Sequence, residues 1–221
     1  MAPDNRNHTD VRDMYSVHEA FRRGLGDAPG QLASVRDGDA KRALLLADYL
    51  GELLWLLHAH HAGEDELLYP LLVARAPEHR ELFSRMDAQH LAMTSGLEAA
   101  QHAASRFGTS GSLVDGRALA LACGSLLDGL SPHLSQEEEE VLPIAARLIS
   151  PPEWGALPGH AFSLYTGTRM WMPFGLAIEA MPADLLAGMR THLPPPMSEM
   201  WFGGGSDAFV AEMAAVRGGA A

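Results

Sequence analysis

Residues 60–70 read HHAGEDELLYP, and residues 133–143 read HLSQEEEEVLP. Each stretch begins with a His, has a Glu four residues later and ends with a Pro ten residues after that His. On an α-helix, side chains four residues apart lie on one face, about 5–6 Å from each other, so the His and Glu of each stretch can bind the same ion. The repeated spacing therefore predicts two helices with metal between them, held by His60, Glu64, His133 and Glu137.

The composition is typical of a folded protein and argues against two classes of partner. The chain has 221 residues, 47% of them hydrophobic, and a formal net charge of −12. Without clusters of Lys and Arg, this charge argues against nucleic acid and against an anionic membrane surface. The single cysteine, Cys123, excludes an intramolecular disulfide and has apolar neighbours, so we expect a packed, inert thiol. With no secretory signal and no apolar run of about 20 residues, we expect a cytoplasmic protein.

The apolar residues recur at helical spacing in four segments. We expect helices over about residues 10–25, 39–72, 77–106 and 113–149, which predicts an all-α, antiparallel up-down four-helix bundle. Gly and Pro residues at 24–30 should end the first helix and open a linker to residue 38. Pro70 should kink or end the second helix, Pro143 should mark a similar bend in the fourth, and Pro132 should kink the fourth without breaking it.

The last seventy residues have a different character. Prolines divide them into short pieces, with helices expected at about 153–170, 183–192 and 207–217. Three tryptophans and many methionines make this segment too apolar to be free in solvent. We divide the chain into a bundle domain at 1–150 and a C-terminal helical extension at 151–221, which packs on the bundle or on a second copy in a homodimer. It either caps the bundle end or forms a dimer interface, or it walls a pocket leading to the metal.

Each expected helix carries a His on its apolar stripe. The candidate ligands from the residues are His18, His60 or His61, Glu64, His90, His133 and Glu137. His60, His90 and His133 come out level in a bundle, whereas His18 is offset by roughly 20 Å unless the 26–38 linker runs back along the bundle. A single buried His is more often a hydrogen-bonded core residue than a ligand, and it is the joint pattern that favours metal. We expect Asp65, Glu66, Glu138 and Glu139 to face solvent, His58 to lie at the surface or behind a ligand, and a surface or structural place for His8, His79, His102, His160 and His192.

These residues resemble the hemerythrin family, including its HHE cation-binding branch, over about residues 10–150. The resemblance rests on the stripe histidines, the two H-x-x-x-E spacings and the stretches HAHHAGEDELLYP at 58–70 and RMDAQH at 85–90, which are similar to bacterial hemerythrin-like proteins. It implies a non-haem, oxo- or hydroxo-bridged centre of two iron ions that binds O2 or a related molecule. The implied ligands are His18, His60, Glu64, His90, His133 and Glu137, with both Glu side chains bridging.

The chain departs from the family pattern at Thr94, where oxygen-carrying hemerythrins have a second helix-three His. Either His61 supplies the seventh ligand, or the second iron has an open position that suits reactivity better than reversible carriage. Three functions follow as alternatives: binding of O2, peroxide or NO for sensing or detoxification; oxidation of a small organic substrate with an external electron donor; and an iron reservoir or structural bundle. Manganese and zinc remain alternatives to iron.

Overall fold

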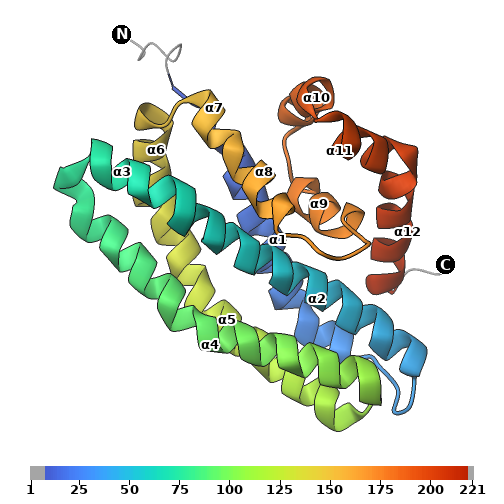
Figure 1. The fold of residues 1–221 in the computed structure, drawn as a ribbon. Helices are drawn as coiled ribbons and strands as arrows, with labels where there is room; N and C mark the ends of the chain where they lie inside the picture. Colours follow the sequence, from blue (N-terminus) through green and yellow to red (C-terminus); the bar gives the residue numbers. More distant parts are fainter. Residues whose placement is uncertain (1–7, 219–221) are drawn as a thin grey trace.

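A computed structural model describes residues 8–218, all of whose regular elements are helical. Four long helices form the bundle predicted from the sequence: α1 (Arg12–Ala33), α2 (Ala40–Gly63), α4 (Arg80–Ser110) and α5 (Leu113–Gln136). Figure 1 shows them running side by side in alternating directions, with α1 against α5, α5 against α4 and α4 against α2. Among the described residues, no helix has both the length and the apolar character needed to cross a membrane.

The first helix is longer than predicted. It continues through Gly24, Gly26 and Pro29 to Ala33, so the expected 26–38 linker along the bundle is wrong. Buried residues continue the apolar stripe beyond position 25, and Gly24 lets α1 approach α2 so closely that a Cβ there would lie 2.3 Å from Leu53 Cδ2. His18 then lies about fifteen residues before the turn and His60 about twenty after it, a height difference of only roughly 8 Å.

The helices continue past both prolines of the duplicated stretch. A π-helical turn, Glu64–Leu68, connects α2 to α3 (Tyr69–Arg75), and a second one, Glu137–Val141, connects α5 to α6 (Leu142–Leu148). In each turn a backbone N–H donates to the carbonyl five residues earlier: Tyr69 to Glu64 and Leu142 to Glu137. Proline cannot donate the normal helical hydrogen bond and clashes with the preceding turn, and the wider π turn just before it accommodates this defect.

The connection between α3 and α4 is short. A 3-10 turn at Pro77–His79 precedes α4, which ends at Ser110 rather than near residue 106. The buried Phe107 keeps the segment that was expected as a turn inside the helix. Gly111 then ends the helix with a φ of +60°, a conformation that glycine adopts without cost.

The C-terminal segment has more helices than predicted. It forms α7 (Pro151–Trp154), α8 (Ala156–Ser163), α9 (Trp171–Ile178), α10 (Ala183–His192), α11 (Pro195–Met200), a π turn at Trp201–Gly205 and α12 (Ser206–Val216). The expected 153–170 helix is wrong in its second half, which is a turn, and α9 and α11 were not predicted. The 183–192 and 207–217 helices are confirmed as α10 and α12.

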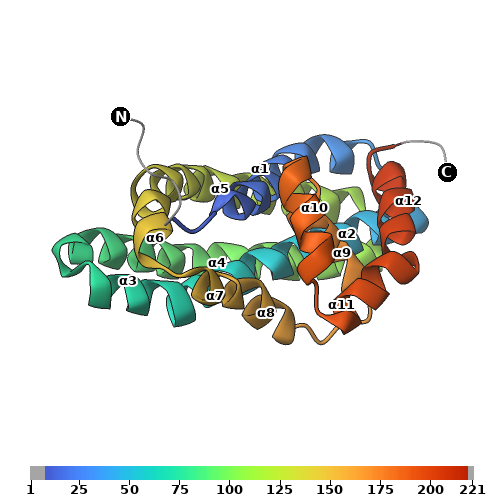
Figure 2. The ribbon, with the colours of Figure 1, turned by 90° about the horizontal axis from the view of Figure 1, so that it is seen from above.

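This segment packs on the bundle along its side. Figures 1 and 2 show this segment on the side of the bundle formed by α1 and α2, with α8, α9 and α12 in contact with these helices and α10 and α11 further out. Met172, Phe174 and Phe209 belong to the same buried core as the apolar residues of α1 and α2. Polar contacts support this packing, because Tyr165 Oη donates to Glu52 Oε1 at 2.8 Å and Arg42 Nη2 to the Val216 carbonyl at 2.7 Å.

Candidate metal centre

The seven residues singled out in the sequence come together in the middle of the bundle, where all of them are buried. They form two neighbouring groups, within each of which one ligand-type atom per residue lies within 4.8 Å of the others. The first group, here called the first set, is His18, His60, Glu64 and Glu137; the second set is His61, His90 and His133. Each of the four long helices contributes at least one His, and each π turn begins with one Glu.

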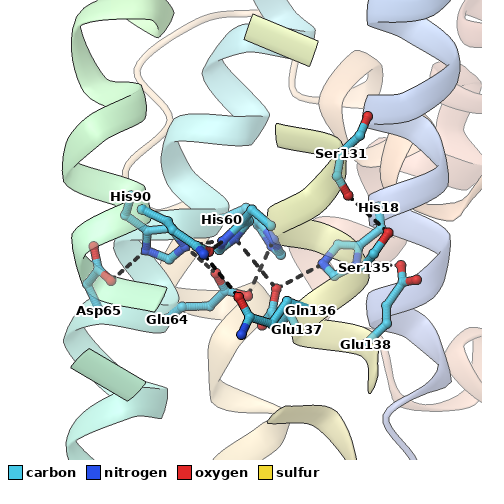
Figure 3. Close-up of polar contacts among 12 residues, drawn as sticks. His18, His60, Glu64, Asp65, His90, Ser131, Ser135, Gln136, Glu137 and Glu138 are labelled. Atoms are coloured by element: carbon cyan, nitrogen blue, oxygen red, sulfur yellow. Dashed lines mark hydrogen bonds and ion pairs between the residues drawn. The ribbon is translucent and has the colours of Figure 1, made fainter. Parts of the chain in front are cut away.

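The two carboxylates connect the sets. Glu64 Oε1 lies 3.3 Å from His60 Nε2, and Glu64 Oε2 lies 3.5 Å from His90 Nε2. Glu137 Oε2 lies 3.4 Å from His18 Nε2 and 3.9 Å from His133 Nε2. Figure 3 shows the side chains of His18, His60, Glu64, His90 and Glu137 pointing toward one another between the helices. Each Glu therefore lies where it can bridge two cations, one in each set.

Many polar atoms of this site are buried without a hydrogen-bond partner among the described residues. They are Nε2 of His18, His60 and His61 and both carboxylate oxygens of Glu64 and Glu137. Buried polar atoms are normally paired, because an unpaired one costs free energy. A cation bound between them would satisfy all of these atoms at once. Imidazole and carboxylate on facing bundle helices fit a pair of iron or manganese ions.

Three imidazoles and one carboxylate of the site are in the protonation state that cation binding requires, whereas Glu64 would have to release a proton. Burial raises the pKa of Glu64, and the negative charge of Glu137 raises it further. Burial also opposes ionisation of Glu137, but hydrogen bonding and positive charge at His18 lower the pKa of Glu137 overall. Burial lowers the pKa of His60 and His61 well below the usual value and that of His133 to about 4. These imidazoles are therefore neutral at pH 7, the form in which a ring nitrogen can bind metal.

Three of the imidazoles are oriented by a second side chain. His90 Nδ1 lies 2.7 Å from Asp65 Oδ1, and His18 Nδ1 lies 2.8 Å from Glu138 Oε1. His133 Nδ1 lies 2.9 Å from Gln89 Oε1. Such contacts fix the ring orientation and leave Nε2 directed at the centre.

Two of these contacts correct the sequence-based prediction, which placed Asp65 and Glu138 in solvent. Each directly follows a Glu of the site inside a π turn, and each reaches a His of a neighbouring helix. In the sequence, each of these acids directly follows a predicted ligand. That position alone does not show that the acid contacts a His, because the contact is with a different helix. Glu66 and Glu139 are exposed as predicted, although Glu66 Oε2 lies 3.3 Å from His160 Nε2.

The structure brings His61 into the site and keeps Thr94 and His58 out of it. The ring of His61 stacks on that of His90, with centroids 4.0 Å apart, so His61 lies inside the second set. Thr94 is exposed, and its hydroxyl donates to the His90 carbonyl of its own helix. His58 is exposed. The side chain of His192 lies outside the described part of the chain.

A cavity of about 770 Å³ lies between the bundle and the C-terminal segment. Residues of α1 and α2 line one side, including His60, and Glu64 lies beside them; residues of α7 to α11 line the other. The C-terminal segment therefore walls a pocket that reaches the first set, which agrees with the second of the two roles considered for it.

Comparison with known proteins agrees with this site. The model of the family described as Hemerythrin HHE cation binding domain matches residues 9–145, a range that contains all seven site residues. Searches of curated proteins and of solved structures gave no match. The match covers more than half of the chain, and the buried His and Glu sets lie inside it. The chain belongs to the hemerythrin HHE cation-binding family.

Proposed function

We propose that the protein is a non-haem di-iron protein that binds or reacts with O2, peroxide or NO. The observation that carries this proposal is the arrangement of Glu64 and Glu137 between two sets of buried imidazoles, with both carboxylates and the Nε2 atoms of His18, His60 and His61 unpaired among the described residues. His18 and His60 would hold one iron and His61, His90 and His133 the other, with both carboxylates shared. The chemistry that two bound iron ions supply is electron exchange with a small oxidant.

The surrounding residues have two tasks in this proposal. Asp65, Glu138 and Gln89 keep three rings in place through Nδ1, so that Nε2 stays available. Leu57, Leu68 and Met86 each lie four residues from a candidate ligand and are almost fully buried, so they shield their side of the site from water. The sequence has no flavin or ferredoxin motif, so electrons would come from an external donor.

The first test is the metal content per chain together with the ultraviolet-visible spectrum of the purified protein. We expect two irons with oxo-to-iron absorption, and a band that forms when O2 meets the reduced protein. One zinc per chain would contradict the proposal. Glu64→Ala should lose most of the iron, whereas Glu66→Ala, which changes an exposed acid two residues away, should retain it.

A second test concerns the ligand that replaces the missing helix-three His. His61→Leu should release metal from the second set and leave about one iron per chain. His58→Leu, at an exposed position three residues earlier on α2, is the matched control and should keep both irons. Two irons in His61→Leu would mean that His61 packs beside the site without binding metal.

One observation favours a second candidate function, the oxidation of a small organic substrate. The cavity against the C-terminal segment reaches His60 and Glu64 and is large enough for an organic molecule, since ligand pockets measure about 300–1,000 Å³. If the protein is such an enzyme, O2 or peroxide consumption with an electron donor should turn over many times per iron. A single stoichiometric burst would contradict this candidate.

A further inference from the structure

The cavity beside the first set is mostly apolar. It lies between α1 and α2 on one side and the C-terminal helices on the other, and its apolar lining includes Met14, Leu157, Phe162, Phe174, Ile178 and Met189. The unpartnered, buried Nε2 of His60 and oxygens of Glu64 belong to residues of the same lining. An apolar pocket with a few convergent polar groups is the usual form of a site for a small organic molecule.

The charged side chains of this cavity are acidic. They are Asp10, Asp13, Glu64 and Asp184, and no Lys or Arg lines it among the described residues. Arg12 Nη2 lies 2.8 Å from Asp10 Oδ2 and 2.7 Å from Asp184 Oδ2, so these two acids already share a cation. Asp13 remains without a cationic partner, and a carboxylate or phosphate ligand placed beside it would be repelled when it is ionised.

Asp13 has the capacity to bind a further donor. Its carboxylate accepts from Trp154 Nε1 at 3.0 Å and from the Met14 backbone N–H at 3.1 Å, and it has no cationic partner among the described residues. An ionised carboxylate can accept about four hydrogen bonds. Burial raises the pKa of Asp13, which means that its negative charge lacks compensation inside the protein.

The position of Asp13 relates it to the metal centre. It lies on α1 five residues before His18, which places it about 7.5 Å away along the helix axis. A molecule that contacts Asp13 at one end can therefore extend along the apolar wall toward His60 and Glu64.

We propose that this cavity binds a mainly apolar organic amine, with its ammonium group on Asp13 and its apolar body directed toward His60 and Glu64. The inference deepens the second candidate function above by naming the class of substrate. The net charge of −12 acts in the same direction, because it attracts cations to the protein and repels anions.

The test compares three ligands with the same apolar body: phenylbutylamine, phenylbutanol and phenylbutyrate. Calorimetric titrations at pH 7 use the protein as purified, under argon and without an electron donor. A hydrogen bond to a charged group contributes roughly 1.5–3 kcal/mol, so the amine should bind about tenfold or more tightly than the alcohol. The carboxylate should bind most weakly. Trp154 fluorescence should change with the amine, since its indole N–H contacts Asp13.

Asp13→Asn removes the charge and keeps an oxygen for Trp154. It should reduce the affinity for the amine to the level of that for the alcohol, and the affinity for the alcohol should not change. Asp128→Asn, at an exposed acid of α5 outside the cavity, is the control and should keep the preference. If Asp13→Asn does not fold, the comparison of the three ligands on the unchanged protein still tests the inference.

Three results would overturn the inference: equal binding of amine and carboxylate, an unchanged preference in Asp13→Asn, or no binding of any of the three ligands. The titration measures binding without any reaction, so its result does not depend on whether the proposed function is correct. A protein with two irons that responds to O2 but binds no amine would overturn this inference alone. A protein that binds the amine but contains no iron would overturn the proposed function alone.

Discussion

At the scale of single residues, the hydrogen bonds behind the imidazoles can be tested without touching a candidate ligand. Glu138→Gln keeps a side chain of the same shape at His18 but removes its charge, and Arg22 Nη1 loses its ionic partner at 2.7 Å. Because such partners orient the ring and raise its basicity, we expect metal affinity to fall about 10–100-fold. Competition with a chelator of known affinity measures this change.

The control for this prediction is the neighbouring exposed acid. Glu139→Gln removes the same charge one residue further on, where no site residue is contacted. If both variants lose affinity equally, the effect is one of net charge rather than of the hydrogen bond to His18.

Asp13 gives a prediction for the pH dependence of stability. Burial raises the pKa of Asp13 above its usual value of 3.8 in the folded state. As pH rises from 3.8 through the raised pKa, the unfolded state releases its proton first, so the folded state binds more protons and the free energy of unfolding falls. Asp13→Asn lacks this contribution and should gain stability relative to the unchanged protein between pH 4 and pH 7.

Urea unfolding at pH 4 and pH 7 measures the difference in the free energy of unfolding between Asp13→Asn and the unchanged protein. If this difference is the same at both pH values, Asp13 has an ordinary pKa, as expected if a cation already neutralises it. Addition of phenylbutylamine should reduce this stability difference at pH 7, because the ammonium group compensates the buried charge of Asp13.

The two buried groups consist of the seven residues that the sequence offered as candidate ligands, most of which lie on or beside apolar stripes, where a polar side chain is unusual. The roles of Asp65, Glu138 and Gln89 could not be predicted from the sequence. An acidic or amide side chain next to a metal ligand usually faces solvent, and only the contacts between helices show that these three reach a His. His61 illustrates the limit. The sequence left it as one of two alternatives, and the fold placed it against His90.

At the scale of elements, the prolines of the duplicated stretches explain where the carboxylates lie. Pro70 and Pro143 each follow a π turn that begins at Glu64 or Glu137. Such turns are rare in helices and are frequent at functional sites. The prolines favour the π turn because the ordinary helical hydrogen bond cannot form at either position.

Replacing both prolines by Ala should therefore raise the stability of the metal-free protein and lower its affinity for metal. The new N–H groups can complete a regular helix, so the metal-free protein should melt at a higher temperature. The carboxylates would lose their position between the two sets, and metal affinity should fall. Thermal melts of the metal-free protein and chelator competition measure the two effects.

Pro29→Ala is the matched control, since Pro29 lies inside α1 far from the site in sequence and in a regular helix. It should raise the melting temperature and leave metal affinity unchanged. Unchanged affinity in the double variant would mean that the π turns persist without the prolines.

The helix pattern was predictable to the extent that buried residues recur regularly. The end of α1 was missed because Gly and Pro normally end helices, yet here Gly24 serves a close contact with α2. The contact is between segments far apart in the chain, and local sequence carries no sign of it. The same reason explains why α9 was missed, since it packs on α1, α2 and α12.

At the scale of the whole molecule, the C-terminal segment gives the bundle a pocket that four helices alone do not have. Its apolar composition predicted that it packs on something, and the alternatives left open were the bundle and a second copy of the chain. In the structure, Phe174 and Phe209 share a buried core with α1 and α2. Within the segment, α9 and α12 pack closely, since a Cβ on Gly175 would lie 2.3 Å from Phe209 Cδ2.

This close contact allows the packing to be weakened without altering the metal site. Gly175→Ala forces α12 away from α9, and such overpacking costs about 1–3 kcal/mol. We expect a lower unfolding temperature and faster amide exchange in α9 to α12, with the metal content unchanged. Affinity for phenylbutylamine should fall as well, because α9 forms part of the cavity wall.

Gly159→Ala in α8 is the control, because a Cβ there meets nothing within 4 Å. It should be neutral or stabilise the protein by up to about 1 kcal/mol, since Ala favours the helix over Gly. If both variants melt alike, α9 and α12 do not touch at Gly175. If Gly175→Ala instead loses iron while its bundle helices remain protected from exchange, the C-terminal segment holds the first set in place as well as walling the cavity.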